Sequence, residues 1–166
     1  MTDSNSQLYR HAVPAHDGCP SFLVCGMVDG LAEVPYFPDP DSDDMALATA
    51  VIEVKTRVHR IQEPPPFYEQ VQAVVYLKLT GHARAELVQY LGTTPEPSPS
   101  DITVSTVSLH GPHATAWAEV ILPRLRTFVS AVQQYREDDG LRMQWLQSSK
   151  DAQRVLLQAL LPYAAV

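Results

Sequence analysis

Glu53 and Lys55 are the residues of this chain whose types and spacing most directly suggest chemistry. They lie in residues 48–56, an apolar stretch rich in β-branched residues that predicts a strand. Strand side chains alternate, so Val51, Glu53 and Lys55 share one face, where an unpaired charge would be costly. A metal ion would explain both groups, because Glu53 could ligate it while Lys55 faces a phosphate or a metal-activated water. The competing interpretation is a surface ion pair on an exposed strand.

Two further stretches put this pair in context. Upstream, an apolar strand carries Asp29 and then Gly30 near its end, and downstream Phe67 opens a helix in which Gln70 follows three residues later. The order Asp-Gly-Leu, Glu-Val-Lys and then an aromatic with Gln-Val-Gln resembles the PD-(D/E)XK nuclease superfamily. Within it, the chain is most similar to the lambda exonuclease and YqaJ-like viral recombinase branch, over about residues 20–137.

The resemblance implies a restriction-endonuclease-like fold and metal-dependent hydrolysis of DNA, as by an exonuclease that acts at duplex ends in recombination or repair. Asp29, Glu53 and the backbone carbonyl of Val54 would hold Mg²⁺, with Mn²⁺ as a substitute. Lys55 would orient or deprotonate the attacking water, and Gln70 would fix Lys55 or a water.

One departure from the family pattern concerns the start of the chain. The family usually has a helix before the catalytic Asp, often with a further metal-binding Glu. Only 28 residues precede Asp29, and they show no helical pattern with an inward Glu. The alternative function is therefore a catalytically weak, nuclease-like module that binds DNA or another protein.

The charge of the chain is unevenly distributed. The net charge is -7, and residues 1–50 hold eight acids against one base, Arg10, whereas residues 51–166 hold eleven of each. An acidic protein does not suit nonspecific coating of DNA. Local bases could still bind a DNA strand, and Arg57, His59 and Arg60 follow the Glu-x-Lys motif closely enough to be the predicted DNA contacts.

Several classes of protein do not fit the sequence. No apolar run is long enough to cross a membrane, and the polar residues 1–6 do not resemble a signal peptide. We therefore expect an intracellular protein of the cytoplasm or nucleus, not a secreted one, with Cys19 and Cys25 as ordinary buried thiols. DNA is the expected partner, and the sequence leaves open a homo-oligomer or a partner subunit.

Periodicity and breakers predict an α/β domain with a central mixed sheet of about four strands flanked by helices. Residues 1–19 are expected to be irregular and 20–166 to form one domain. The predicted strands are 20–33, 47–58, 84–91 and 102–109, with an acidic, Pro-rich loop at 34–46. The predicted helices are 67–80, 113–136 with a kink at Pro123, 141–147 and 149–161. We expect the two longer helices to bury Phe67, Val71, Val74, Ile121, Leu125 and Phe128.

Overall fold

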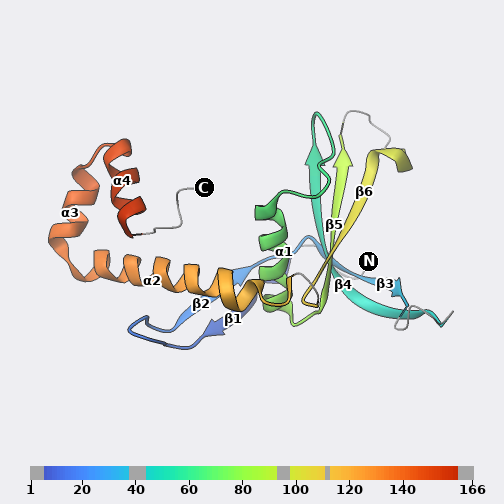
Figure 1. Cartoon of the computed structure of the whole chain (residues 1–166), viewed down its shortest axis with the longest axis horizontal. Helices are drawn as coiled ribbons and strands as arrows, with labels where there is room; N and C mark the ends of the chain where they lie inside the picture. Colours follow the sequence, from blue (N-terminus) through green and yellow to red (C-terminus); the bar gives the residue numbers. More distant parts are fainter. Residues whose placement is uncertain (1–5, 38–43, 93–97, 111–112, 161–166) are drawn as a thin grey trace. The chain divides into compact units, whose positions relative to one another are not determined.

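The computed structural model describes residues 6–37, 44–92, 98–110 and 113–160 (Figure 1). Contacts divide the chain into two compact units, where the sequence predicted one domain over 20–166. The first unit comprises residues 1–11 and 24–117, and the second comprises residues 12–23 and 118–166. Each unit is described by itself.

The first unit is built on a four-stranded mixed sheet. Its strands are β3 (Gly30–Tyr36), β4 (Ala46–Arg57), β5 (Arg84–Leu91) and β6 (Ile102–Ser108), in that order across the sheet. β4 and β5 are parallel, and the two outer pairs are antiparallel. Parallel neighbours need a crossover connection, which helix α1 (Phe67–Thr80) provides. A short 3₁₀ turn, η1 (Pro99–Asp101), leads into β6. The predicted α/β class and mixed sheet of four strands are confirmed.

Helix α1 has the predicted bounds, because its ends are marked by strong local signals. Three prolines precede it, and Gly81 ends it with a left-handed φ of 77° while its N–H donates to the carbonyl of Leu77 at 3.0 Å. Its buried face differs from the predicted stripe. Val74 is buried as expected and Val71 partly so, but Phe67 is 62% exposed. The residues buried on α1 are Glu69, Ala73, Val74, Leu77 and Leu79.

The N-terminal part is more ordered than predicted. β1 (Tyr9–Val13) pairs with β2 (Phe22–Gly26) in a separate two-stranded sheet, so residues 1–19 are not irregular throughout. The single strand predicted over 20–33 is divided between β2 and β3, with a break before Gly30. The predicted loop 34–46 is also shorter at both ends, and residues 38–43 lie outside the described part. Pro35 belongs to β3, an edge strand, where a missing N–H is tolerated.

The helical part of the chain begins with a π-helical segment, η3 (Ala116–Ile121), in place of the regular helix predicted from 113. It leads into α2 (Leu122–Glu137), α3 (Asp139–Gln147) and α4 (Lys150–Leu160). Pro123 is the second residue of α2, but the chain is already helical before it, since Ile121 has φ -73° and ψ -53°. The kink predicted at Pro123 stays a prediction. Ile121 is buried and Leu125 partly buried, but Phe128 is 50% exposed, contrary to the prediction.

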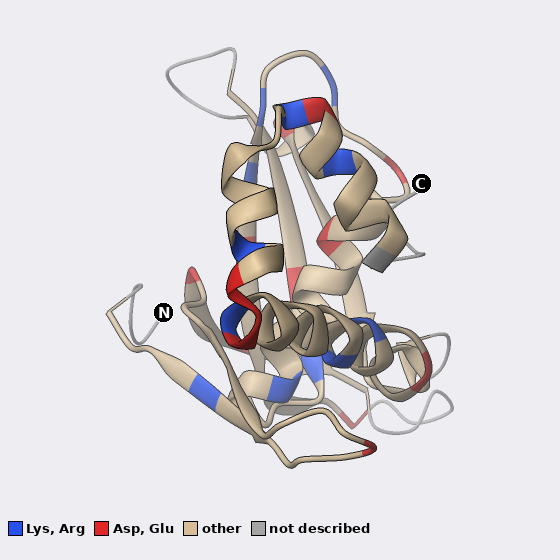
Figure 2. Cartoon of the chain, turned by 90° about the vertical axis from the view of Figure 1, so that its left-hand side faces the viewer, with Lys and Arg blue, Asp and Glu red and all other residues tan. Residues whose placement is uncertain are grey.

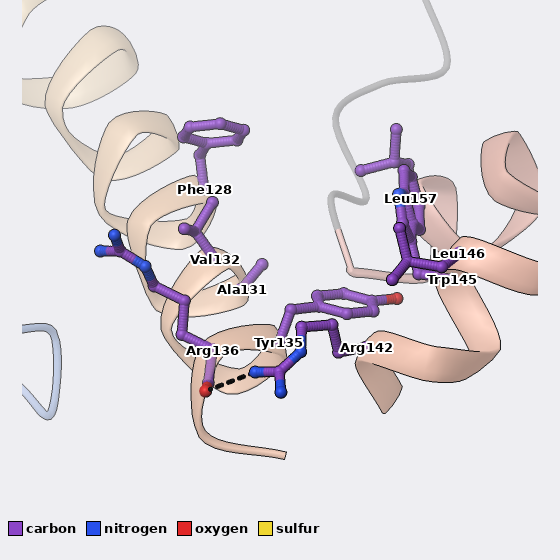
Figure 3. A pocket seen from close by; sticks show the side chains of 9 residues that line it. All are labelled: Phe128, Ala131, Val132, Tyr135, Arg136, Arg142, Trp145, Leu146 and Leu157. Carbon is purple, nitrogen blue, oxygen red and sulfur yellow. Dashed lines mark hydrogen bonds between the residues drawn. The ribbon is translucent and has the colours of Figure 1, made fainter. Parts of the chain in front are cut away.

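Helices α2, α3 and α4 leave an apolar hollow of about 470 Å³ in the second unit (Figure 3). Tyr135 and Trp145 meet edge to face there, with ring centroids 5.5 Å apart. Leu146 at the rim is 67% exposed.

Within the described residues, no helix is long and apolar enough to span a membrane. Charged residues of both signs are dispersed over the elements (Figure 2).

Candidate active site

Strand β4 presents Glu53 and Lys55 to the face on which α1 packs. Val51 and Glu53 are buried at 0% and 4% exposure, whereas Val54, which follows Glu53, is 43% exposed, so the predicted alternation is confirmed. The Lys55 ammonium donates a hydrogen bond to Glu53 Oε1 at 2.6 Å. The two side chains are 23% and 6% exposed, which makes this a largely buried ion pair and not a surface one.

Gln72 of α1 completes this pair. Its Oε1 accepts from Lys55 Nζ at 2.9 Å, and its Nε2 donates to Glu53 Oε1 at 3.0 Å and to the Tyr76 hydroxyl at 2.8 Å. The amide therefore uses its acceptor and both donors. Because Gln72 and Tyr76 are one helical turn apart, α1 holds Lys55 and Glu53 with a rigid element. We call Glu53, Lys55, Gln72 and Tyr76 the Glu53 cluster.

Asp29 comes directly before β3 and lies beside β4, at the point where these two strands begin to pair. The first pair of the ladder is Gly30 with Ile52. Two residues further along β4, the backbone N–H of Val54 donates to Asp29 Oδ2 at 2.8 Å. In an antiparallel ladder the N–H and C=O of one residue face the same neighbour, so the Val54 carbonyl is directed to the edge that Asp29 occupies. Asp29 and Val54 are therefore neighbours where β3 begins to pair with β4, and Glu53 precedes Val54 in the chain.

The electrostatics agree with that placement. Burial raises the pKa of the Glu53 carboxyl; its hydrogen bond to Lys55 opposes this, and the charge of Asp29 adds to the rise. Burial acts to lower the pKa of Lys55, but the hydrogen bond and charge of Glu53 outweigh it, so its pKa is raised. Lys55 is therefore an ammonium at neutral pH in this arrangement. It can orient a water or stabilise phosphate charge, whereas deprotonating water would first require loss of its own proton.

The donor set is compatible with a hard divalent cation. Among described residues, the hydrogen bonds to Glu53 fall on Oε1 and the one to Asp29 falls on Oδ2, so each carboxylate has an oxygen outside these bonds. No group of three or more His, Cys, Asp or Glu side chains gathers to hold a metal within the described residues. Mg²⁺ does not require such a group, because it keeps several waters and binds through one or two carboxylates.

Gln70 was predicted to fix Lys55 or a water, but the glutamine that contacts Lys55 is Gln72. Gln70 Nε2 donates to the carbonyl of Pro65 at 2.6 Å, which ties the start of α1 to the proline turn. The prediction counted three residues from Phe67 and assumed that Phe67 faces inward, but Phe67 is 62% exposed. Gln72 was missed. The signal that could have identified it is its spacing of four residues from Tyr76, which places two polar side chains on one flank of the helix.

Arg57 does not have the exposed side chain expected of a DNA contact. Its guanidinium forms a two-pronged ion pair with Glu69 of α1, at 2.9 and 2.5 Å, and its side chain is 12% exposed. His59 and Arg60 are exposed beyond the end of β4, so their predicted contact with DNA stays a prediction. Cys19 and Cys25 are both free thiols, but only Cys19 is buried.

Comparison with known proteins gives little further information. No family model matches the chain, and no curated protein matches it. A solved structure titled "Crystal structure of SSO0001" is similar over 64% of this chain and 41% of that chain, with 16% sequence identity and a TM-score of 0.43. The chain therefore spans less than half of that neighbour, and the likeness is too distant to support an argument about fold or function.

Proposed function

We propose that this chain is a metal-dependent deoxyribonuclease that hydrolyses phosphodiester bonds at DNA ends. One observation carries the proposal: Glu53 and Lys55 pair near the point where Asp29 joins β4, and Gln72 forms one hydrogen bond to each member of the pair. Structural ion pairs are usually satisfied on all sides. Here the two carboxylates, Asp29 and Glu53, repel each other, and the ammonium of Lys55 beside Glu53 is partly exposed.

The chemistry is a displacement at phosphorus. A water oxygen forms a bond to phosphorus, the ester P–O bond breaks, and the products are a phosphate monoester and a hydroxyl group. Lys55, held by Glu53 and Gln72, would orient the water and stabilise the negative charge on the phosphate oxygens. Asp29, Glu53 and the Val54 carbonyl would hold the metal. When bound, Mg²⁺ would lower the pKa of the water and supply positive charge at the phosphate.

The test is degradation of end-labelled duplex DNA with Mg²⁺ or Mn²⁺, compared between the wild-type protein and Glu53→Gln. The matched control is Glu33→Gln, which removes an exposed carboxylate of β3 in the same unit. We expect metal-dependent degradation by the wild type and the control, and none by Glu53→Gln. If the folded wild-type protein degrades no DNA at any concentration of either metal, the nuclease proposal is wrong, and DNA binding without cleavage would then favour a nuclease-like binding module.

A further inference from the structure

Two neighbouring aromatic rings lie exposed at the start of α1. Phe67 and Tyr68 are 62% and 67% exposed, although rings of this size usually supply much of a core. A single exposed apolar residue needs no explanation, but Tyr68 also lies one helical turn from Gln72 of the candidate active site. Nothing in the folding of α1 requires the two exposed rings, because its buried face is formed by other residues.

Helical spacing places Tyr68 next to the Glu53 cluster. Tyr68, Gln72 and Tyr76 are four residues apart along α1 and therefore lie on one flank, one helical turn or about 5.4 Å from each to the next. Phe67 is about 100° further round the helix and faces a different way. The pKa of Arg57, the last residue of β4, is raised, chiefly by its hydrogen bond to Glu69 and to a lesser degree by the nearby Tyr68. Tyr68 thus lies near Arg57, at the end of β4, and one helical turn from Gln72, which contacts Lys55.

The surroundings of Tyr68 favour a polyanion with flat, apolar groups. The Lys55 ammonium contacts Gln72 on this flank of α1, and the exposed His59 and Arg60 follow the end of β4. An aromatic ring beside cations is the usual arrangement by which proteins bind single-stranded nucleic acid, since bases stack on the ring while cations contact phosphates. A base inside a duplex already has both faces covered by its neighbours. An exposed ring can therefore stack only on an unpaired base.

We propose that Tyr68 stacks on an unpaired base of DNA whose phosphate lies at Glu53 and Lys55, so that single-stranded or frayed ends are the preferred substrate. This inference rests on the proposed nuclease function, because it assigns the class of DNA to that same site. Stacking of one base on an aromatic ring contributes about 1–3 kcal/mol, which corresponds to roughly 5- to 150-fold in affinity.

The experiment measures binding without metal, so that it does not depend on cleavage. Fluorescence anisotropy would give the affinity of the full chain, in a chelator, for a labelled single strand, a blunt duplex of the same length, and a single strand with abasic sites. The variants are Tyr68→Ala, Tyr68→Phe, which keeps the ring, and Phe37→Ala. Phe37 is the matched control, because it is 60% exposed and lies far from Lys55. It follows Tyr36, which pairs with Ala46, and Ala46 is nine residues, or roughly 30 Å, along β4 from Lys55.

We expect Tyr68→Ala to weaken single-strand binding about 10-fold and duplex binding less than about twofold, while Tyr68→Phe and Phe37→Ala bind as the wild type does. Abasic sites should weaken binding by the wild type but not by Tyr68→Ala. Equal binding of single strands by Tyr68→Ala and the wild type, equal loss in Tyr68→Phe, or no single-strand binding at all would overturn the proposal. A wild type that binds in this pattern but cleaves nothing with Mg²⁺ or Mn²⁺ would overturn only the nuclease function.

Discussion

Two clusters on the same face of β4 combine the same kinds of group in different ways. In the Glu53 cluster an ammonium and an amide both donate to one carboxylate oxygen, Glu53 Oε1. In the second, Arg57 donates to both oxygens of Glu69 and, through Nε, to Gln89 Oε1 at 2.8 Å. Gln89 is 0% exposed, and its amide also exchanges two hydrogen bonds with the backbone of Gln62. We call Arg57, Glu69 and Gln89 the Arg57 cluster.

The Arg57 cluster stabilises the fold, whereas the Glu53 cluster has groups that can take part in a reaction. A guanidinium matches both oxygens of a carboxylate, so the Arg57 cluster is saturated and joins β4, α1 and β5. A lysine ammonium is a compact charge that leaves more of its carboxylate for another partner. Residues two apart on one strand face can therefore serve different purposes.

The largest effect should come from removing one negative charge in the Glu53 cluster. We expect Glu53→Gln to lower the rate of DNA cleavage by at least about 100-fold, because a lost metal ligand removes several kcal/mol of transition-state stabilisation. The variant should stay folded, since burial already disfavours the charge of Glu53. Initial rates with end-labelled DNA and circular dichroism check both statements. If Glu53→Gln unfolds while Glu69→Gln stays folded but inactive, the two clusters have been assigned the wrong way round.

Breaking the Arg57 cluster should act on stability. Arg57→Ala leaves Glu69 buried at 2% exposure without its ion-pair partner, and such a change costs about 3–5 kcal/mol. Urea denaturation measures the free energy of unfolding. Lys55→Ala is the matched control, because it removes a cation from the same strand face but leaves a carboxylate that Gln72 still contacts. A loss in Lys55→Ala as large as in Arg57→Ala would contradict the distinction.

The two glutamines of α1 test the sequence-based interpretation against the structure. We expect Gln72→Ala to lower the cleavage rate about 10-fold, since Lys55 and Glu53 lose the amide that orients them. Gln70→Ala should change the rate less than about twofold, because the Gln70 amide donates to the carbonyl of Pro65 before α1 and not to the Glu53 cluster. Steady-state rates of the two variants, at equal stability, decide between them. Equal loss in both would restore the catalytic role predicted for Gln70.

These two glutamines also show which features of the structure could be predicted from the sequence. Strands β4, β5 and β6 and helix α1 were predictable, because alternation, three prolines and Gly81 act over a few residues. The inward face of α1 was not, because it is set by Glu69, whose partner Arg57 lies twelve positions earlier and meets it only through the crossover. The pairing of β1 with β2 was missed for a similar reason: each strand has five residues, and neither buries a continuous apolar face.

The smallest effect, and the finest test of the comparison, concerns the Tyr76 hydroxyl. It accepts one of the two N–H bonds of the Gln72 amide, and the other goes to Glu53. In Tyr76→Phe the ring stays while one partly buried donor loses its acceptor, at a cost of about 0.5–1.5 kcal/mol.

If the Glu53 cluster is a positioned chemical group, this cost should appear as a few-fold lower cleavage rate, because the amide that holds Lys55 becomes free to rotate. Metal affinity should be less affected. If the cluster only braces the fold as the Arg57 cluster does, the cost should appear in urea denaturation alone. Measuring the rate at saturating metal together with the free energy of unfolding distinguishes the two, and an unchanged rate in a destabilised Tyr76→Phe would refute positioning through Gln72.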